Sequence, residues 1–390
     1  MGDLRRALHA LLAVTEARVD GLRGALRRRG RGGPIPVEIH LYGGHGNSRE
    51  SVVRGRVLES RVIPPARPED PAWRNLLGAL ARLESDEVPG AVVRVRAGTV
   101  DVAVESDEEG YFEARFPTPE GTGLWRTVEA TLASVPFPFE PGAVSSGEYQ
   151  VPSPRAEFGV ISDLDDTVLQ TEATSLVRMA RRTLMHNAHT RLAFRGVGAF
   201  YRALRTAQGG SERPFFYVSS SPWNLYDLLA EFLDLNDIPR GTLLLKDYGL
   251  TSDHLLASDH VTHKLGHVFA VIDTHLELDF VLIGDSGQDD ASVYATVVAD
   301  RPGRVRAVYL RDVGTGRPAV RAALDEITAA GVPAVLGADT ESLARSAAEA
   351  GLVAAEMLEA LAESETPAPG RSAPVVRVPA PDLDDEPSRG

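Results

Sequence analysis

Three apolar stretches of this sequence end in side chains that can do chemistry. The stretch FGVIS is followed by Asp163-Leu164-Asp165-Asp166-Thr167, FFYV by Ser219-Ser220-Ser221, and FVLIG by Asp285-Ser286-Gly287-Gln288-Asp289-Asp290. Lys264, in the segment VTHKLGHV, lies between the second and third of these. Because ligands collect beyond the carboxyl ends of the strands in an open α/β sheet, we expect these side chains to meet in one pocket.

The acidic side chains predict a bound cation. Carboxylates that are brought together repel one another and resist ionisation unless a cation compensates them. Oxygen ligands and the absence of cysteine favour Mg²⁺, which usually takes one or two carboxylates together with waters and a substrate phosphate. A lysine and hydroxyl groups beside this ion suit a phosphate dianion, because phosphoryl transfer depends on positioning and on neutralising developing charge.

Two of the carboxylates have the spacing of a nucleophile and a general acid. An aspartate can attack phosphorus and form an aspartyl-phosphate that water then hydrolyses. A second carboxyl two residues away can protonate the departing oxygen and then remove a proton from the attacking water. Asp163 and Asp165 are the candidates for these two roles.

The order of the motifs resembles that of a known superfamily. Asp163-x-Asp165-x-Thr167, Ser219, Lys264, and Gly284-Asp285 with the acids that follow are similar to the four ordered motifs of the haloacid dehalogenase (HAD) superfamily. More narrowly, SDLDDTV, YVSSSPWNLY, the PRG of DIPRGTLLLKDYG, and LIGDSGQDD resemble the actin-patch phosphatidate phosphatase family, including its bacterial members. The similarity covers about residues 158–312.

This resemblance implies a Mg²⁺-dependent phosphatase that converts phosphatidate to diacylglycerol through an aspartyl-phosphate. It implies that Asp163 is the nucleophile and a metal ligand, and that Asp165 is the general acid and base and offers its backbone carbonyl to the metal. Asp285 is then the other carboxylate ligand, and Asp290 belongs to the metal site by ordering metal-bound water.

The resemblance also implies how the phosphate is held. Ser219, Ser220 and Lys264 would bind it, and Thr167 would support the loop after the nucleophile. The expected partner is therefore a phospholipid, with peripheral membrane contact left open and the protein partner unknown.

The elements expected to position these residues form an α/β fold. FGVISD, PFFYVSS, FVLIGD and VRAVYLRDV are nearly continuous in apolar residues, as is typical of parallel strands covered on both faces, and NLYDLLAEFLDL and PAVRAALDEITAAG are helical in pattern. We expect a HAD-like doubly wound parallel sheet over 155–362, with a short cap insertion at 170–193.

The residues before this domain have a different period. VEIHLYGGHG, SVVRGRVLESRV, AVVRVRAGTVDVAVESDEEGYFEARF and WRTVEATLAS alternate apolar and polar residues, and DEEG reads as a hairpin turn. They predict a β-sandwich-like domain over 35–150, which the Pro- and Gly-rich link 136–154 joins to the next. A basic amphipathic helix is expected in 1–31 and a disordered, Pro-rich, acidic tail in 363–390.

Composition narrows the class of protein. With 43% hydrophobic residues, 25% charged residues and no apolar run near the ~18–20 residues that cross a bilayer, the 390-residue chain reads as globular and cytoplasmic, with peripheral membrane location left open. The net charge of −14 argues against nucleic acid as a partner. Residues 1–31 depart from this balance, since they hold eight arginines and three acids.

Several other interpretations remain open at this stage. The aspartates and serines are also common as helix caps and turn residues, and Trp223 and Tyr226 suit either a core or an acyl chain. His260, His263 and His267 have helical spacing and could bind zinc. The alternative functions are a phosphatase for a soluble metabolite or protein, and a non-catalytic membrane-recruitment or scaffold module.

Overall fold

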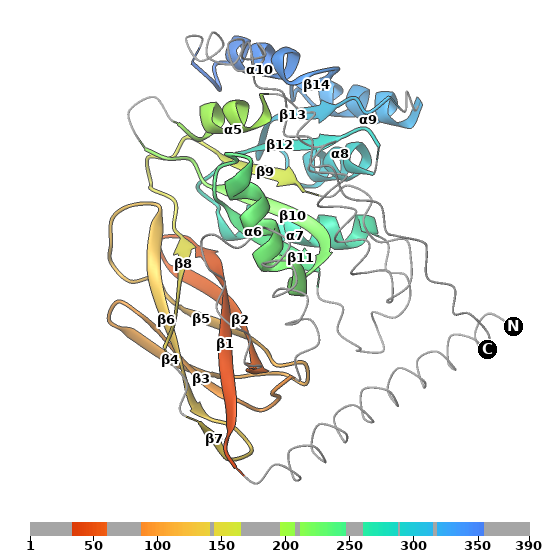
Figure 1. Ribbon diagram of the computed structural model, residues 1–390. Coiled ribbons are helices and arrows are strands. Elements are labelled where there is room, and N and C mark those ends of the chain that lie inside the picture. The colour runs from red at the N-terminus through yellow and green to blue at the C-terminus, as the bar shows by residue number, and fades with distance from the viewer. Residues whose placement is uncertain are drawn as a thin grey trace, which may run out of the picture.

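The chain forms two sheets that lie one beside the other (Figure 1). The computed structural model describes residues 33–60, 87–140, 144–164, 196–206, 211–246, 260–287, 289–314 and 318–354. The predicted helix in 1–31, the cap insertion at 170–193 and the tail 363–390 lie outside these residues. No helix among the described residues is long and apolar enough to cross a membrane.

The first sheet has eight strands and curls almost into a barrel. Its strands are β1 (Ile35–Gly46), β2 (Glu50–Glu59), β3 (Val92–Ala97), β4 (Val100–Glu105), β5 (Tyr111–Pro117), β6 (Trp125–Ser134), β7 (Phe139–Glu140) and β8 (Ser145–Gln150). They are ordered β4-β3-β6-β8-β1-β2-β5, with β7 beside β1, and the end strands β4 and β5 lie against each other. One apolar cluster fills the interior, because alternate residues of β3 and β5 point inward.

The second sheet has six parallel strands. These are β9 (Gly159–Asp163), β10 (Phe215–Pro222), β11 (Thr242–Lys246), β12 (Phe280–Asp285), β13 (Val305–Arg311) and β14 (Ala334–Gly337), ordered β11-β10-β9-β12-β13-β14. All five strand pairings in this sheet are parallel, so the carboxyl ends of all six strands lie at the same edge.

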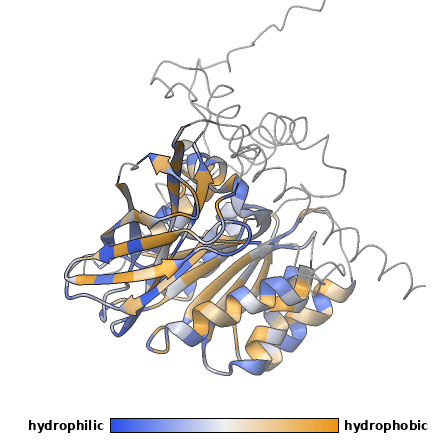
Figure 2. Ribbon diagram, turned by 90° about the horizontal axis from the view of Figure 1, so that it is seen from below, coloured by the Kyte–Doolittle hydropathy of each residue, from blue (hydrophilic) through white to orange (hydrophobic). Residues whose placement is uncertain are grey.

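Helices cover both faces of the parallel sheet. They are α5 (Val197–Arg205), the short 3-10 helix η3 (Trp223–Leu225), α6 (Tyr226–Leu235), α7 (His260–Thr274), α8 (Asp290–Asp300), α9 (Pro318–Ala329) and α10 (Thr340–Glu349). One apolar cluster lies under α7, α8 and α9, and a second lies under α5, α6 and α10. Figure 2 shows that the helices carry both hydrophilic and hydrophobic residues, as expected for helices with one face on a sheet.

The predicted fold class is wrong. We expected a HAD-like doubly wound parallel sheet preceded by a sandwich, but the described residues hold more strand than helix, and the largest sheet is the mixed, mostly antiparallel, near-barrel sheet β1–β8. Only the second sheet is parallel. Alternation shows that a strand has one buried face, and a curled sheet buries that face as well as two stacked sheets do, so the pattern cannot distinguish them.

Two local expectations also change. The DEEG segment does form a turn, in which the Asp107 carboxylate accepts hydrogen bonds from the backbone of Glu109 and Tyr111, but it joins β4 and β5 at opposite ends of the sheet order. The expected link 136–154 contains β7 and β8. Serine, glycine and proline are typical of links, so this segment was not predicted as a strand. The last two residues of β8, Tyr149 and Gln150, are buried. The domain bounds 35–150 and 155–362 stay predictions.

Buried polar contacts join the two sheets. The Gln150 side chain donates hydrogen bonds to the backbone carbonyl of Phe215 and to Oγ1 of Thr242, both at 2.7 Å. Thr242 in turn donates to the carbonyl of Gly44 at 3.0 Å. Since unmade buried hydrogen bonds are costly, these contacts fix the position of the sheets relative to each other.

Candidate active site

The predicted site residues follow apolar strands at one edge of the parallel sheet. Asp163 ends β9, Ser219 and Ser220 lie within the last part of β10, and Asp285 ends β12. Strands β10 and β12 are both neighbours of β9, and the backbone N–H of Leu164 donates to the carbonyl of Val218 at 2.9 Å. Regular parallel pairing therefore brings these strand ends together although they are far apart in sequence.

Two helices supply the remaining described residues. Lys264 comes from α7, and Asp290 is the first residue of α8. The Lys264 ammonium lies 2.8 Å from Oδ1 of Asp163 and 2.9 Å from Oδ1 of Asp290, and all three side chains are almost fully buried. Lys264 thus partly neutralises two carboxylates that would otherwise be isolated charges in a low-dielectric environment.

Three carboxylates converge beside this lysine. One oxygen of each of Asp163, Asp285 and Asp290 lies within 4.8 Å of the other two. Three acids against one buried lysine leave an excess of negative charge, and carboxylate oxygens are the ligands that a hard divalent cation takes. Among the described residues this is the one group of three or more potential metal ligands, and its donor set fits Mg²⁺.

Asp290 is held in place by backbone as well as by Lys264. Its Oδ2 accepts a hydrogen bond from the backbone N–H of Asp285 at 3.0 Å. Burial raises the pKa of the Asp290 carboxyl above its usual range, while the nearby Lys264 opposes the rise. A Cβ added to Gly284 would lie 2.4 Å from Oδ2 of Asp290, so glycine at 284 permits this approach.

Asp285 is fixed by the loop that follows it. Its Oδ1 accepts a hydrogen bond from the backbone N–H of Gly287 at 2.7 Å, and the carboxylate lines a cavity together with Asp163. Asp289 is exposed and makes no side-chain cap at the start of α8, so it lies apart from the buried carboxylates.

The serines of β10 are buried and do not cap the next helix. Ser219 is 1% exposed, and its Oγ accepts a hydrogen bond from the backbone N–H of Ser221 at 3.0 Å. The residue before η3 is Pro222, and neither η3 nor α6 has a side-chain cap hydrogen bond. Capping therefore does not explain the run Ser219–Ser221.

Asp165 and Thr167 lie outside the described residues, so their predicted positions stay predictions.

The histidines of α7 make a different contact from the one a zinc site needs. His263 and His267 are joined directly through their Nε2 atoms at 3.1 Å, and burial lowers the pKa of His267 to about 3. Neither belongs to a group of three ligands among the described residues.

The structure favours the interpretation of Trp223 and Tyr226 as core residues over the one in which they contact an acyl chain. Trp223 is 5% exposed and stacks on Tyr42 of the first sheet with ring centroids 5.1 Å apart. Tyr226 lies 5.0 Å from the same ring, and burial raises its pKa to about 12. These aromatic rings pack the junction between the two sheets.

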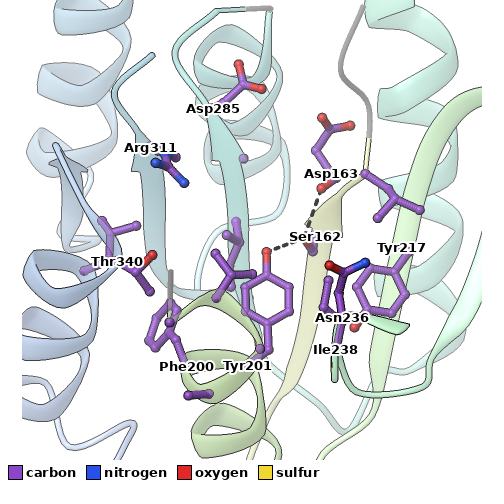
Figure 3. Close-up of a pocket in the computed structure, with 18 of the residues that line it drawn as sticks. Ser162, Asp163, Phe200, Tyr201, Tyr217, Asn236, Ile238, Asp285, Arg311 and Thr340 are labelled. Carbon is purple, nitrogen blue, oxygen red and sulfur yellow. Dashed lines mark hydrogen bonds between the residues drawn. The ribbon is translucent and has the colours of Figure 1, made fainter. Parts of the chain in front are cut away.

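The other walls of the site were not predicted from the sequence. A cavity of about 330 Å³ opens beside Asp163 and Asp285 and is also lined by Tyr201 and Arg311. Figure 3 shows the Tyr201 hydroxyl joined to Ser162, a hydrogen bond of 2.8 Å. Arg311 is the first polar residue at the end of an apolar strand, so the rule that found Asp163 would have found it. A cavity formed by several helices leaves no such signal.

The comparisons with known proteins match the part of the chain that holds the candidate site. The family model described as "Phosphatidate phosphatase APP1, catalytic domain" matches residues 158–312. Phosphatidate phosphatase APP1 of Saccharomyces cerevisiae is 30% identical over 155 residues, which are 40% of this chain and 26% of that protein. An uncharacterized protein of Schizosaccharomyces pombe is 26% identical over 160 residues, 41% of this chain and 26% of that protein. The matches thus span far less than two thirds of either relative.

Among solved structures, a carbohydrate acetylesterase from Xanthomonas citri is similar with a TM-score of 0.28 and 9% identity, covering 77% of this chain and 68% of that chain. The family match supports the predicted phosphatase and the narrower family resemblance. Membership of the wider HAD superfamily stays a prediction.

Proposed function

We propose that this protein is a phosphatase that releases phosphate from phosphatidate. Its residues 158–312 match the family model of the catalytic domain of phosphatidate phosphatase APP1. The observation that carries the proposal is the convergence of Asp163, Asp285 and Asp290, two of which, Asp163 and Asp290, contact Lys264. A group of buried acids beside one cation suits the binding of a metal ion and a phosphate far better than it suits packing.

The proposed reaction has two steps. Asp163 attacks phosphorus, its Oδ–P bond forms, and the P–O bond to the diacylglycerol oxygen breaks as Asp165 gives that oxygen a proton. Asp165 then takes a proton from water, whose oxygen attacks phosphorus, and the bond to Asp163 breaks to release inorganic phosphate. The Lys264 ammonium, 2.8 Å from Oδ1 of Asp163, partly balances the negative charge of the proposed nucleophile.

Mg²⁺ would be held by Asp163 and Asp285 together with the backbone carbonyl of Asp165, and Asp290 would belong to the metal site by ordering water. The ion would neutralise charge on the phosphate oxygens. In the same proposal Ser219 and Ser220 bind the phosphate and Thr167 supports the loop after the nucleophile. The buried position of both serines at the end of β10, next to β9, supports this role.

The test compares Asp163→Asn with Asp325→Asn, an exposed aspartate on α9. We expect Asp163→Asn to lower kcat on phosphatidate in mixed micelles by about 10³-fold or more, because an amide is a poor nucleophile, and Asp325→Asn to keep wild-type turnover. A loss in both variants, or turnover by Asp163→Asn within about tenfold of wild type, would contradict the mechanism.

The same assay separates the alternatives. Removing divalent ions with a chelator should stop phosphate release, and added Mg²⁺ should restore it. A higher kcat/KM on glycerol 3-phosphate than on phosphatidate would instead favour a soluble substrate. Absence of Mg²⁺-dependent phosphate release from either substrate would favour a non-catalytic module.

A further inference from the structure

The cavity beside the carboxylates has the size of a small-molecule site. Its volume of about 330 Å³ lies within the range of roughly 300–1,000 Å³ found for ligand pockets. Figure 3 shows Asp163 and Asp285 toward its upper end, and Phe200, Tyr201 and Ile238 toward its lower end. Whatever fills the cavity therefore lies directly beside the side chains that are proposed to act on phosphorus.

Apolar side chains from three helices and the sheet form much of the wall of this cavity, and Asn236, Arg311 and Thr340 are among the polar residues that also line it. Helix α5 contributes one wall, and the end of α6, the start of α10 and strand β12 contribute the others. The apolar lining residues that matter most are Val197, Phe200, Phe232, Ile238, Ile283 and Leu343. Five of them belong to or pack against one apolar cluster, so the cavity is a gap in the core beneath α5, α6 and α10.

An apolar cavity next to a phosphate site favours an amphiphilic guest. A hydrocarbon chain gains about 0.8 kcal/mol for each methylene group taken from water. The apolar side chains of the lining therefore favour the hydrocarbon end of a phosphomonoester.

We propose that this cavity binds one acyl or alkyl chain of the substrate and so sets the chain-length specificity of the enzyme. The inference rests on the proposed phosphatase function and deepens it by assigning the site of lipid recognition. Because Asp163 lines the cavity and is also the proposed nucleophile, a chain attached to the bound phosphate would lie directly beside the cavity.

The first experiment needs no variant. Phosphate release from the full chain is measured on n-alkyl phosphates from butyl to dodecyl, each below its micelle-forming concentration. We expect kcat/KM to rise by about two- to fourfold for each added methylene group and to level off once the cavity is full. Equal kcat/KM for all chain lengths would overturn the inference while leaving the phosphatase function in place.

The second experiment fills the cavity. Ala199 of α5 lines it, whereas Ala322 of α9 is exposed and belongs to the opposite face of the parallel sheet. Ala199→Phe should lower the ratio of kcat/KM on dodecyl phosphate to that on butyl phosphate by about tenfold, and Ala322→Phe should keep the wild-type ratio. An unchanged ratio in Ala199→Phe would overturn the inference; Val197→Phe replaces this variant if it fails to fold.

A binding measurement separates failure of this inference from failure of the proposed function. Alkylphosphonates resist hydrolysis, so calorimetry reports their affinity whether or not the protein turns over an ester. Affinity that rises with chain length would support the cavity assignment even if no ester released phosphate. Affinity independent of chain length would overturn it even if phosphatidate were hydrolysed.

Discussion

Gly284 shows how closely the site residues are packed. Its missing side chain leaves room for the Asp290 carboxylate, which accepts a hydrogen bond from the backbone N–H of Asp285. A Cβ at position 284 would lie 2.9 Å from Cγ of Asp290 and 2.4 Å from its Oδ2. Because Asp290 is also paired with Lys264, it has little freedom to move aside.

We therefore predict opposite effects of the same substitution at two glycines. Gly284→Ala should destabilise the protein by about 1–3 kcal/mol, since overpacking a buried site forces neighbours out of position. Gly266→Ala, at an exposed position in α7 where an added Cβ meets nothing within 4 Å, should stabilise it by about 0.5–1 kcal/mol. Urea unfolding followed by circular dichroism measures both, and a stability of Gly284→Ala equal to wild type would show that Asp290 can shift.

At the residue scale, the sequence predicted the gathering of Asp163, Lys264, Asp285 and Asp290 because motif order and strand ends carry that information. It could not predict the two-carboxylate contact of Lys264, since helix α7 supplies the side chain from a position that no strand-end rule covers. Nor could it predict the hydrogen bond between Ser162 and Tyr201, which depends on how α5 packs on β9.

At the scale of elements, α7 connects the site to the first sheet. Just beyond the helix, Nε2 of His275 lies 3.1 Å from Nδ1 of His45 in β1, and the Asn47 side chain donates to the carbonyl of Thr274 at 2.7 Å. Burial, and then Arg54 and Arg115, lower the pKa of His45 to about 4 against an opposing effect of Glu113. Burial also lowers the pKa of His275, with smaller contributions from His45 and Arg304.

This histidine pair predicts a pH dependence of stability. Between about pH 6.5 and 4 the unfolded chain binds a proton at position 45 that the folded chain does not. The free energy of unfolding therefore keeps the full contribution of His45 above pH 6.5. As the pH falls toward 4 this contribution is lost, and the free energy of unfolding drops by on the order of 3 kcal/mol.

The measurement compares the free energy of unfolding at pH 7 and pH 4 in wild type, His45→Gln and His40→Gln. The fall between the two pH values should be smaller in His45→Gln than in wild type, while His40→Gln, a half-buried position on the same strand, should fall like wild type. An equal fall in all three proteins would show that protonation of His45 costs nothing in the folded state.

The element scale also shows which sequence signals were reliable. The four predicted parallel strands and the helices at 224–235 and 318–331 correspond to elements of the structure, because long apolar runs and helical periodicity are strong signals. Strands β11 and β14 were missed, as five- and four-residue strands give little pattern. The sandwich prediction failed because sheet closure depends on contacts between β4 and β5 rather than on either strand alone.

At the scale of the whole molecule, the two sheets share a packed junction. The buried bonds of Gln150, the histidine pair and the stack of Trp223 on Tyr42 all cross it. Trp125 of β6 also contacts Arg240, whose charge lies 4.4 Å from the centre of its ring. A junction with this many buried contacts couples the unfolding of one sheet to that of the other.

We predict a single unfolding transition for the described part of the chain. A variant with Trp73→Phe and Trp223→Phe leaves Trp125 as the fluorescent reporter, and one with Trp73→Phe and Trp125→Phe leaves Trp223. In each, the urea midpoint from fluorescence should equal the midpoint from far-ultraviolet circular dichroism of the same sample. Distinct midpoints in either variant would mean that the sheets unfold separately.

The placement of Lys264 has a practical consequence for chemical modification. The chain contains two lysines, Lys246 and Lys264, and the second is 4% exposed between two carboxylates. Amine-directed acylating reagents need a neutral, accessible amine, so they should reach Lys246 long before Lys264. The rate at which Lys264 is acylated would then measure how often the catalytic centre opens transiently to solvent.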